Sequence, residues 1–384
     1  MSWMTAPEAL ALLKVQPQTL YANVSRGKIR AQPDAKDPRR SRYFRDDVLR
    51  LAKSTQGRRK SEAVATGAIA WGDPVLPSAI STVIDGRLFY RGQDAVLLSG
   101  QAGLEDIAAL LWQGEYGSLE VSAVTDGQSP GAAANPLSNA LLALAARVAT
   151  DLPTRRRAPA VLREDAARVF AVVADALLGP PRVKRRQSLS QRVASSWRRP
   201  AAEDMIRRAL VLLADHELNS STFAARVTIS TGASMSAAML TGLATLSGPL
   251  HGGAWASVMR LVDHAARDGV QAAVREPLAQ GRRLAGFGHP LYPHGDCRAS
   301  ALLAHFTVPT LHVELAQVVE ELAGERPNVD FALCAMTTAL DLPPHAPFTI
   351  FALARCVGWL AHALEQASEG RLIRPRAKYV GVMP

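Results

Sequence analysis

Apolar residues along most of this chain recur at the spacing of helices that bury one face. The clearest such runs cover residues 104–111, 141–148 and 161–177, and their period predicts amphipathic helices. The turn residues Asp85 and Gly86 instead indicate a short β element around residues 80–90. The pattern therefore predicts a mainly α chain with few strands.

The longest apolar stretch, residues 346–364, contains Arg355 and His362. Ionisable groups are costly in the centre of a bilayer, so we predict a buried helix here and no membrane span. The N-terminus lacks the charged-then-apolar pattern of a signal peptide, and the three cysteines form no C-x-x-C pair. We expect a soluble, cytoplasmic protein without a metal site.

The first sixty residues predict a small unit of short elements: helices at 5–13, at 17–26 and from about 48, with β-prone pieces at 28–30 and 42–44. This order resembles the winged helix-turn-helix domain of MerR-type regulators and excisionases. In such domains the second helix enters the major groove of DNA. The resemblance implies DNA contacts from two groups, the second helix with Gln18, Thr19, Tyr21, Asn23 and Arg26, and the wing with Arg39, Arg40 and Arg42.

Charge is concentrated in the same unit. Residues 1–60 hold 14 Lys and Arg against 5 Asp and Glu, a net charge of +9, out of +10 for the whole chain. This asymmetry indicates an acidic partner for the N-terminal unit alone. A basic unit used for protein contacts, or for none, is the alternative. The polar stretch after residue 53 predicts a domain at 1–55, a linker at 56–66 and a second domain at 67–384.

Two histidines and one carboxylate stand in Gly- or Pro-marked segments of the second domain: His251 within 248–253, His289 within 286–292, and Asp330 after Pro327. Glycines let a backbone approach a ligand closely. A His near a helix N-terminus has a lowered pKa and donates hydrogen bonds as a neutral ring, although a simple capping role for His251 is the alternative. Such a set can remove a proton from carbon while protonating an oxygen elsewhere.

These motifs, together with the octet from Asp215 to Thr222, resemble those of citrate synthases, which condense acetyl-CoA with oxaloacetate. The resemblance runs from about Ile80 to Gly381. It implies a mostly helical fold with a large domain and a smaller one, roughly 215–330, that closes over CoA.

The same resemblance assigns roles to single residues. It implies that Asp330 removes the α-proton of the thioester, that His251 donates to the enolate, and that His289 binds and protonates the carbonyl of the oxo acid. His216 would contact the oxo acid, with Ser221 beside the site.

Three arginines match the residues that bind the two substrate carboxylates in the family. Arg298 follows His289, and Arg355 lies inside an apolar helix, where a guanidinium is costly unless it pairs with an anion. Arg374 matches an arginine donated across the dimer interface, so the resemblance implies a homodimer.

Some positions depart from the family pattern. Pro293 replaces a basic residue that contacts a CoA phosphate, Cys297 replaces a proline, and Trp255 replaces a common Asn. Other cations are available to replace the lost phosphate contact, namely the cluster 182–186 or the pair Arg282 and Arg283.

The resemblance implies condensation of an acyl-CoA with a 2-oxo acid, first of all acetyl-CoA with oxaloacetate. Propionyl-CoA, giving 2-methylcitrate, is the alternative acyl donor. The thioester is a substrate, and no cofactor is expected. A hypothesis of another class is a DNA-binding transcriptional regulator whose synthase-like body senses CoA esters or oxo acids without catalysing a reaction.

Overall fold

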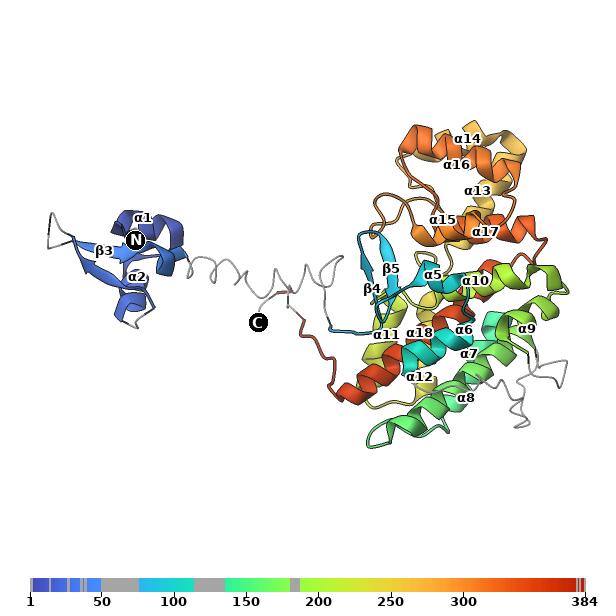
Figure 1. Ribbon diagram of the computed structural model, residues 1–384, viewed down its shortest axis with the longest axis horizontal. Helices are drawn as coiled ribbons and strands as arrows, with labels where there is room; N and C mark the ends of the chain where they lie inside the picture. Colours follow the sequence, from blue (N-terminus) through green and yellow to red (C-terminus); the bar gives the residue numbers. More distant parts are fainter. Residues whose placement is uncertain are drawn as a thin grey trace. The chain divides into compact units, whose positions relative to one another are not determined.

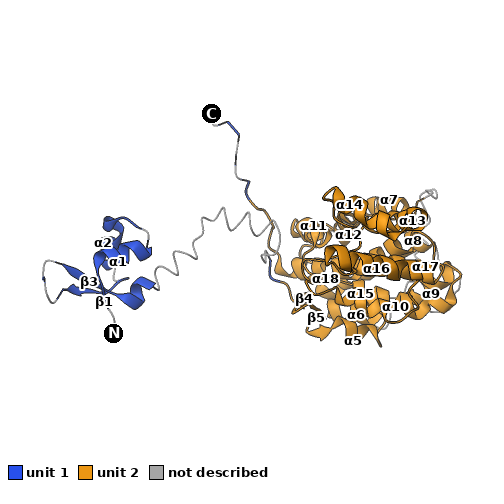
Figure 2. Cartoon of the chain, turned by 90° about the horizontal axis from the view of Figure 1, so that it is seen from above, with its two compact units in different colours: residues 1–77, 376–384 blue, residues 78–375 orange. Residues whose placement is uncertain are grey.

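The computed structural model describes residues 3–13, 15–25, 28–34, 37, 40–49, 76–113, 135–179, 187–377, 379 and 381–382. The chain forms two compact units, residues 1–77 with 376–384 and residues 78–375 (Figure 2). The linker expected at 56–66 lies outside the described residues, so the boundaries at 55 and 67 stay predictions.

The N-terminal unit combines two helices with an antiparallel sheet. α1 (Ala6–Leu13) and α2 (Pro17–Ser25) precede β2 (Ala31–Pro33) and β3 (Ser41–Phe44), and β1 (Trp3–Met4) completes the sheet in the order β1-β3-β2. A small apolar core joins these elements; it contains Met4, Ala9, Leu13, Leu20, Ile29, Tyr43 and Val48. The assignment of this unit to the winged helix-turn-helix class stays a prediction.

Local details of this unit follow the sequence only in part. The capping box is present, because Thr5 N donates to Glu8 Oε2 at 2.7 Å and Glu8 N donates to Thr5 Oγ1 at 3.5 Å. The strand expected at 28–30 was misplaced: Ile29 is buried in the core, and pairing begins at Ala31, opposite Tyr43. Helical residues also appear at 45–49, before the expected start at 48.

The second unit opens with a small antiparallel sheet. β4 (Ser81–Ile84), β5 (Arg87–Tyr90) and β6 (Gln93–Asp94) lie in the order β4-β5-β6. The β element expected around 80–90 is therefore a hairpin, in register from Ser81 opposite Tyr90 to Ile84 opposite Arg87. Both turn residues have a left-handed backbone, with φ 50° at Asp85 and φ 72° at Gly86; aspartate tolerates this conformation and glycine adopts it without strain.

The rest of this unit is helical (Figure 1). Its elements are α5 (Ala95–Ser99), α6 (Leu104–Trp112), α7 (Pro136–Val148), α8 (Pro159–Leu178), α9 (Leu189–Ser196), the short 3₁₀ turn Pro200–Ala202, α10 (Glu203–Leu213), α11 (Ser220–Ser230), α12 (Met235–Leu246), α13 (Trp255–Asp268), α14 (Val270–Ala279), α15 (Cys297–Leu303), α16 (Thr310–Ala323), α17 (Val329–Ala339) and α18 (Ala346–Glu369). The helices predicted from apolar spacing are α6, α7 and α8.

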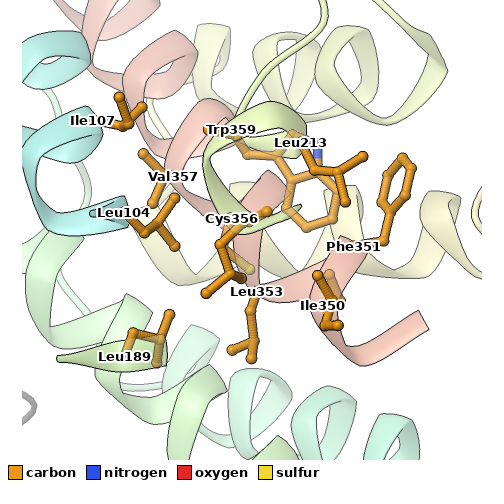
Figure 3. Close-up of a cluster of buried hydrophobic side chains, with 14 of the residues drawn as sticks. Leu104, Ile107, Leu189, Leu213, Ile350, Phe351, Leu353, Cys356, Val357 and Trp359 are labelled. Atoms are coloured by element: carbon orange, nitrogen blue, oxygen red, sulfur yellow. The ribbon is translucent and has the colours of Figure 1, made fainter. Parts of the chain in front are cut away.

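α18 is the central helix of the larger core. It packs against α6, α8, α10, α11 and α12. Figure 3 shows side chains of α18 within this core, with Val357 next to Leu104 of α6. Among the described residues it is the one helix long and apolar enough to cross a membrane, but 89% of its apolar window is buried inside the protein. The prediction of a buried helix is confirmed.

A second apolar cluster lies at the upper end of this unit in Figure 1. It joins α13, α14 and α16 through buried residues such as Val258, Val274 and Leu315. α11 and α12 pack instead with α18 in the larger core, so this cluster is narrower than the subdomain expected at 215–330. α17 belongs to both, because Ala332 faces the larger core and Phe331 faces the smaller one.

Candidate active site

The segment that carries His216 is tied to β4 on both sides. Ser81 Oγ donates to Asp215 Oδ2 at 2.5 Å, and Glu217 Oε1 accepts from Val83 N at 2.7 Å. Glu217 has a left-handed backbone with φ 50°, a conformation that costs free energy and needs such support. The hairpin therefore fixes the turn that presents His216 after α10.

His216 faces residues of the loop that contains His289. Its Nε2 lies 2.8 Å from Tyr292 Oη, and its ring centroid lies 5.1 Å from that of His289. Burial lowers the pKa of His216 well below its usual value, and the cations Arg298 and Arg355 lower it further. His216 is thus a neutral ring at neutral pH.

Tyr292 was not predicted as a functional residue. It is buried, contacts His216 through its hydroxyl, and lies under the guanidinium of Arg298 at 5.1 Å from the ring centroid. The available signal was one phenol within a polar, Gly-rich loop beside a candidate catalytic His, where a buried hydroxyl needs a hydrogen-bond partner.

The hydrogen bond of His289 fixes the proton on its ring. Leu291 N donates to His289 Nδ1 at 3.2 Å, so a neutral His289 carries its proton on Nε2 and donates from there. Burial lowers the pKa of His289 to about 4, and nearby Arg298 adds to the effect. At neutral pH this ring is a hydrogen-bond donor without a charge.

Arg298 is held by the carboxylate of Asp296, which caps α15. Arg298 Nε lies 2.9 Å from Asp296 Oδ1, and Arg298 Nη2 lies 2.8 Å from Asp296 Oδ2. This pair occupies one edge of the guanidinium and leaves the edge formed by both Nη atoms for a further anion. Asp296 Oδ2 also accepts from Val329 N at 3.0 Å, which links this pair to α17.

His251 contacts Ser221 in a polar cluster under α18. Ser221 Oγ lies 2.7 Å from His251 Nε2 and also 2.7 Å from Asn219 Oδ1, while Trp359 Nε1 donates to it at 3.1 Å. A hydroxyl has one proton, so the choice between these two acceptors decides which nitrogen of His251 carries its proton. Trp359 and Asn219 were not predicted as parts of the site.

The pKa of His251 is lowered, as expected, but for a different reason. Burial lowers it to about 4, and the positive charge of Arg355 adds to the effect. α13 begins only at Trp255, so the helix N-terminus invoked from the sequence is not the main cause. His251 is nevertheless neutral at neutral pH.

Asp330 stands in the first turn of α17. Asn328 caps this helix by accepting from Asp330 N at 3.0 Å. Burial raises the pKa of Asp330 to about 6, although Arg298 and Arg355 act in the opposite direction. A carboxylate with a pKa near 6 is ionised at neutral pH and is a stronger base than an exposed aspartate.

Arg355 is buried on α18 at 1% exposure, where its Nε donates to Leu213 O at 3.1 Å. Its guanidinium lies over the Phe351 ring at 4.7 Å. Burial lowers the pKa of Arg355 to about 10, and within the described part of the chain no carboxylate forms an ion pair with it. Arg374 is exposed beyond the end of α18, and the structure does not bring it to the other site residues of its own chain.

The residues expected to contact DNA lie in the N-terminal unit. Gln18, Thr19 and Tyr21 are exposed on α2, and Asn23 Nδ2 donates to Thr19 O at 2.9 Å. Arg42 pairs with Asp34 at 2.6 Å, and Arg40 pairs with Asp37 at 3.3 Å, so both wing cations already have carboxylate partners. Arg26 and Arg39 lie outside the described residues.

The family model for the C-terminal domain of citrate synthase matches residues 69–376. Citrate synthase of Haloferax volcanii is 33% identical over 345 residues, which covers 77% of this chain and 90% of that protein. Putative citrate synthase 2 of Mycobacterium tuberculosis is 33% identical and is covered over 88% of its length, with 78% of this chain. The chain belongs to the citrate synthase family, and it is an enzyme of the citrate synthase type.

Solved structures agree with this assignment. Citrate synthase from Thermotoga maritima superposes with a TM-score of 0.65 at 27% identity, covering 82% of this chain and 95% of that one. Citrate synthase from Thermoplasma acidophilum, solved in a ternary complex with carboxymethyl coenzyme A and oxaloacetate, gives a TM-score of 0.67 at 25% identity, covering 81% of this chain and 94% of that one. The mainly helical citrate synthase fold is therefore confirmed, and residues 1–68 lie outside the family match.

Proposed function

We propose that this protein condenses acetyl-CoA with oxaloacetate and water to give citrate and CoA. The observation that carries the proposal is a set of three groups around two shared cations: Asp330 lies within electrostatic range of Arg298 and Arg355, His289 within range of Arg298, and His251 within range of Arg355. Burial raises the pKa of Asp330 to about 6, and it lowers the pKa values of both histidines to about 4. One ionised base and two neutral donors are what enolate formation followed by carbonyl attack requires. Propionyl-CoA, giving 2-methylcitrate, is the alternative acyl substrate.

In the first step Asp330 takes a proton from the α-carbon of the thioester. The C–H electron pair moves into the enolate, and negative charge develops on the thioester oxygen. When Ser221 donates its proton to His251 Nε2, at 2.7 Å, the neutral ring carries its own proton on Nδ1. Nδ1 then donates to the enolate oxygen, which stabilises the charge as it forms.

In the second step the enolate carbon attacks the 2-oxo carbon of oxaloacetate, and a carbon–carbon bond forms. His289, whose Nδ1 accepts from Leu291 N, gives the Nε2 proton to the carbonyl oxygen as this becomes a hydroxyl. Water then hydrolyses the thioester of the condensed product, which releases CoA and the new carboxylate. His216, held by Tyr292, positions the oxo acid.

Two carboxylates of oxaloacetate need guanidinium partners. Arg298 offers its second edge, and Arg355 offers a buried cation that lacks an ion pair among the described residues. Arg374, exposed past α18, would complete the site of a second copy, so a homodimer is part of the proposal.

The phosphates of CoA need cations as well, and Pro293 has no charge. Arg282 and Arg283, which are both exposed before His289, are our candidates for these contacts. The cluster 182–186 lies outside the described residues.

The test is thiol release from acetyl-CoA and from propionyl-CoA, each with and without oxaloacetate. We expect release to depend on oxaloacetate, and the ratio of the two rates to identify the acyl substrate. Thiol release at the same rate with and without oxaloacetate would indicate a simple thioesterase. Absence of release from either thioester by folded protein would contradict the proposal.

A second function, DNA binding through residues 1–55, is favoured by the +9 charge of residues 1–60 and by the exposed α2 side chains. We expect the full chain to bind a labelled duplex of its upstream region in anisotropy titrations, with affinity that falls as salt rises. Arg40→Glu should weaken binding several-fold, whereas Arg275→Glu, an equal charge change on exposed α14, should not. Lack of binding at low salt, with or without acyl-CoA, would exclude this function.

A further inference from the structure

Three residues of α18 share one face behind the oxo-acid site: Arg355, Gly358 and His362. Spacings of three and four residues place side chains above one another on a helix. Asp215, the neighbour of His216 in the sequence, lies against Gly358, between the other two residues. A Cβ at Gly358 would stand 2.3 Å from Asp215 Oδ1, so only glycine admits this approach. Asp215 therefore lies between Arg355 and His362.

The carboxylate of Asp215 is fully buried and is bonded on one side only. Its Oδ2 accepts from Ser81 Oγ at 2.5 Å and lies 3.2 Å from His362 Nε2. Its Oδ1 has no hydrogen-bond partner among the described residues. Asp215 acts on Arg355 electrostatically, since it opposes the lowering of the Arg355 pKa by burial, but the two side chains form no ion pair.

The nitrogen of His362 that faces Asp215 is Nε2, and the contact on the other side of the ring makes it a donor. Arg226 Nη1 lies 3.3 Å from His362 Nδ1, and since a guanidinium only donates, Nδ1 accepts and the ring proton is on Nε2. Arg226 is itself fully buried and is held by Glu365 at 2.6 Å and by Gln366 at 2.9 Å. The bonds of Arg226 on the Nδ1 side of the His362 ring thus determine that Nε2 is the nitrogen that donates to Asp215.

We propose that His362 is a positioning residue for the oxo-acid site, because it holds the Asp215 carboxylate away from the Arg355 guanidinium and keeps that guanidinium open to a substrate carboxylate. The inference rests on the proposed function of Arg355. A released Asp215 would form a charge-assisted pair with Arg355 and would compete with the substrate as an internal anion. Held at a distance, it supplies negative charge that stabilises the buried cation without occupying it.

The test combines His362→Leu with Asp215→Asn. His362→Leu should raise KM for oxaloacetate about tenfold, with kcat and KM for the acyl-CoA changed less than about threefold. Asp215→Asn in the same protein should reverse most of the rise, because a neutral amide does not compete with an anion. His362→Gln should restore KM, since its amide donates to Asp215 and accepts from Arg226.

Leu353→Ala is the matched control. It removes a buried apolar side chain of the same helix that packs in the larger core (Figure 3), and it leaves the hydrogen bonds that join Asp215, His362 and Arg226 intact. It should lower Tm without raising KM for oxaloacetate. If His362→Leu does not fold, Ser81→Ala removes the other partner of Asp215 Oδ2, and its smaller rise in KM should likewise be reversed by Asp215→Asn.

Calorimetric titration with oxaloacetate alone separates this inference from the proposed function. Wild-type protein that neither binds oxaloacetate nor turns over would contradict the proposed function itself. If the wild-type protein and the His362→Leu variant bind oxaloacetate with equal affinity, only the role of His362 is overturned. A rise in KM that persists in the Asp215→Asn background would also overturn it, because the effect would then not pass through Asp215.

Discussion

Asp330→Asn is expected to lower kcat for oxaloacetate-dependent thiol release by about a thousandfold, within the range for loss of a positioned base. The amide keeps the shape of the side chain and the cap from Asn328 to residue 330 N, but it cannot accept the α-proton. The substitution should not destabilise the fold. The raised pKa of Asp330 means that its contribution to stability is present at low pH and is lost as pH rises through about 6. At neutral pH the amide should therefore leave Tm unchanged or raise it.

The control for this variant is binding of oxaloacetate, which should be retained. Mixing Asp330→Asn protein with Arg374→Ala protein provides a further check, because a mixed dimer would contain one site with both native residues. Activity that returns on mixing supports the shared site. Full turnover by Asp330→Asn alone would exclude Asp330 as the base.

The pH dependence of kcat/KM is expected to show the second large effect. The base must be ionised in the free enzyme, and burial raises the pKa of Asp330 to about 6. The value of kcat/KM should therefore fall about tenfold for each pH unit below 6, a loss of about a hundredfold at pH 4. His251 and His289, whose pKa values are lowered to about 4, remain neutral over most of this range.

The measurement is kcat/KM for the acyl-CoA at constant ionic strength, with circular dichroism at each pH to confirm that the protein stays folded. A profile that stays level through pH 6 and declines only near 4 would mean that an ordinary, solvated carboxylate is the base. A decline that begins near 7 would instead point to a histidine that must be neutral.

The site residues that could be predicted from the sequence are those in short contiguous motifs. His216, Ser221, His251, His289 and Arg298 each stand in a Gly-, Pro- or polar-marked segment, and the structure brings them into mutual contact or electrostatic range. The helices were accessible for a similar reason, since apolar spacing reports which face is buried.

Partners far apart in the chain were not accessible. Trp359 and Ser221 are 138 residues apart, and His362 and Asp215 are 147 apart, so no local pattern joins them. The strand at 28–30 was misplaced because the sequence does not show what an apolar residue contacts. Ile29 is apolar because it packs in the core, and not because its backbone pairs in a sheet. For His251, the sequence predicted the direction of the pKa shift, but its main cause is burial.

α17 contributes side chains to both apolar clusters, and Asp330 stands at its first turn. The smaller cluster therefore cannot open by local unfolding without disturbing the helix that carries the base. Enzyme warmed or treated with denaturant would stop turning over once the region of α13, α14 and α16 loosens, before the larger core gives way. Because the smaller cluster buries fewer apolar side chains than the larger core, we expect it to loosen first, and the temperature of inactivation would then report the stability of this cluster and not that of the whole chain.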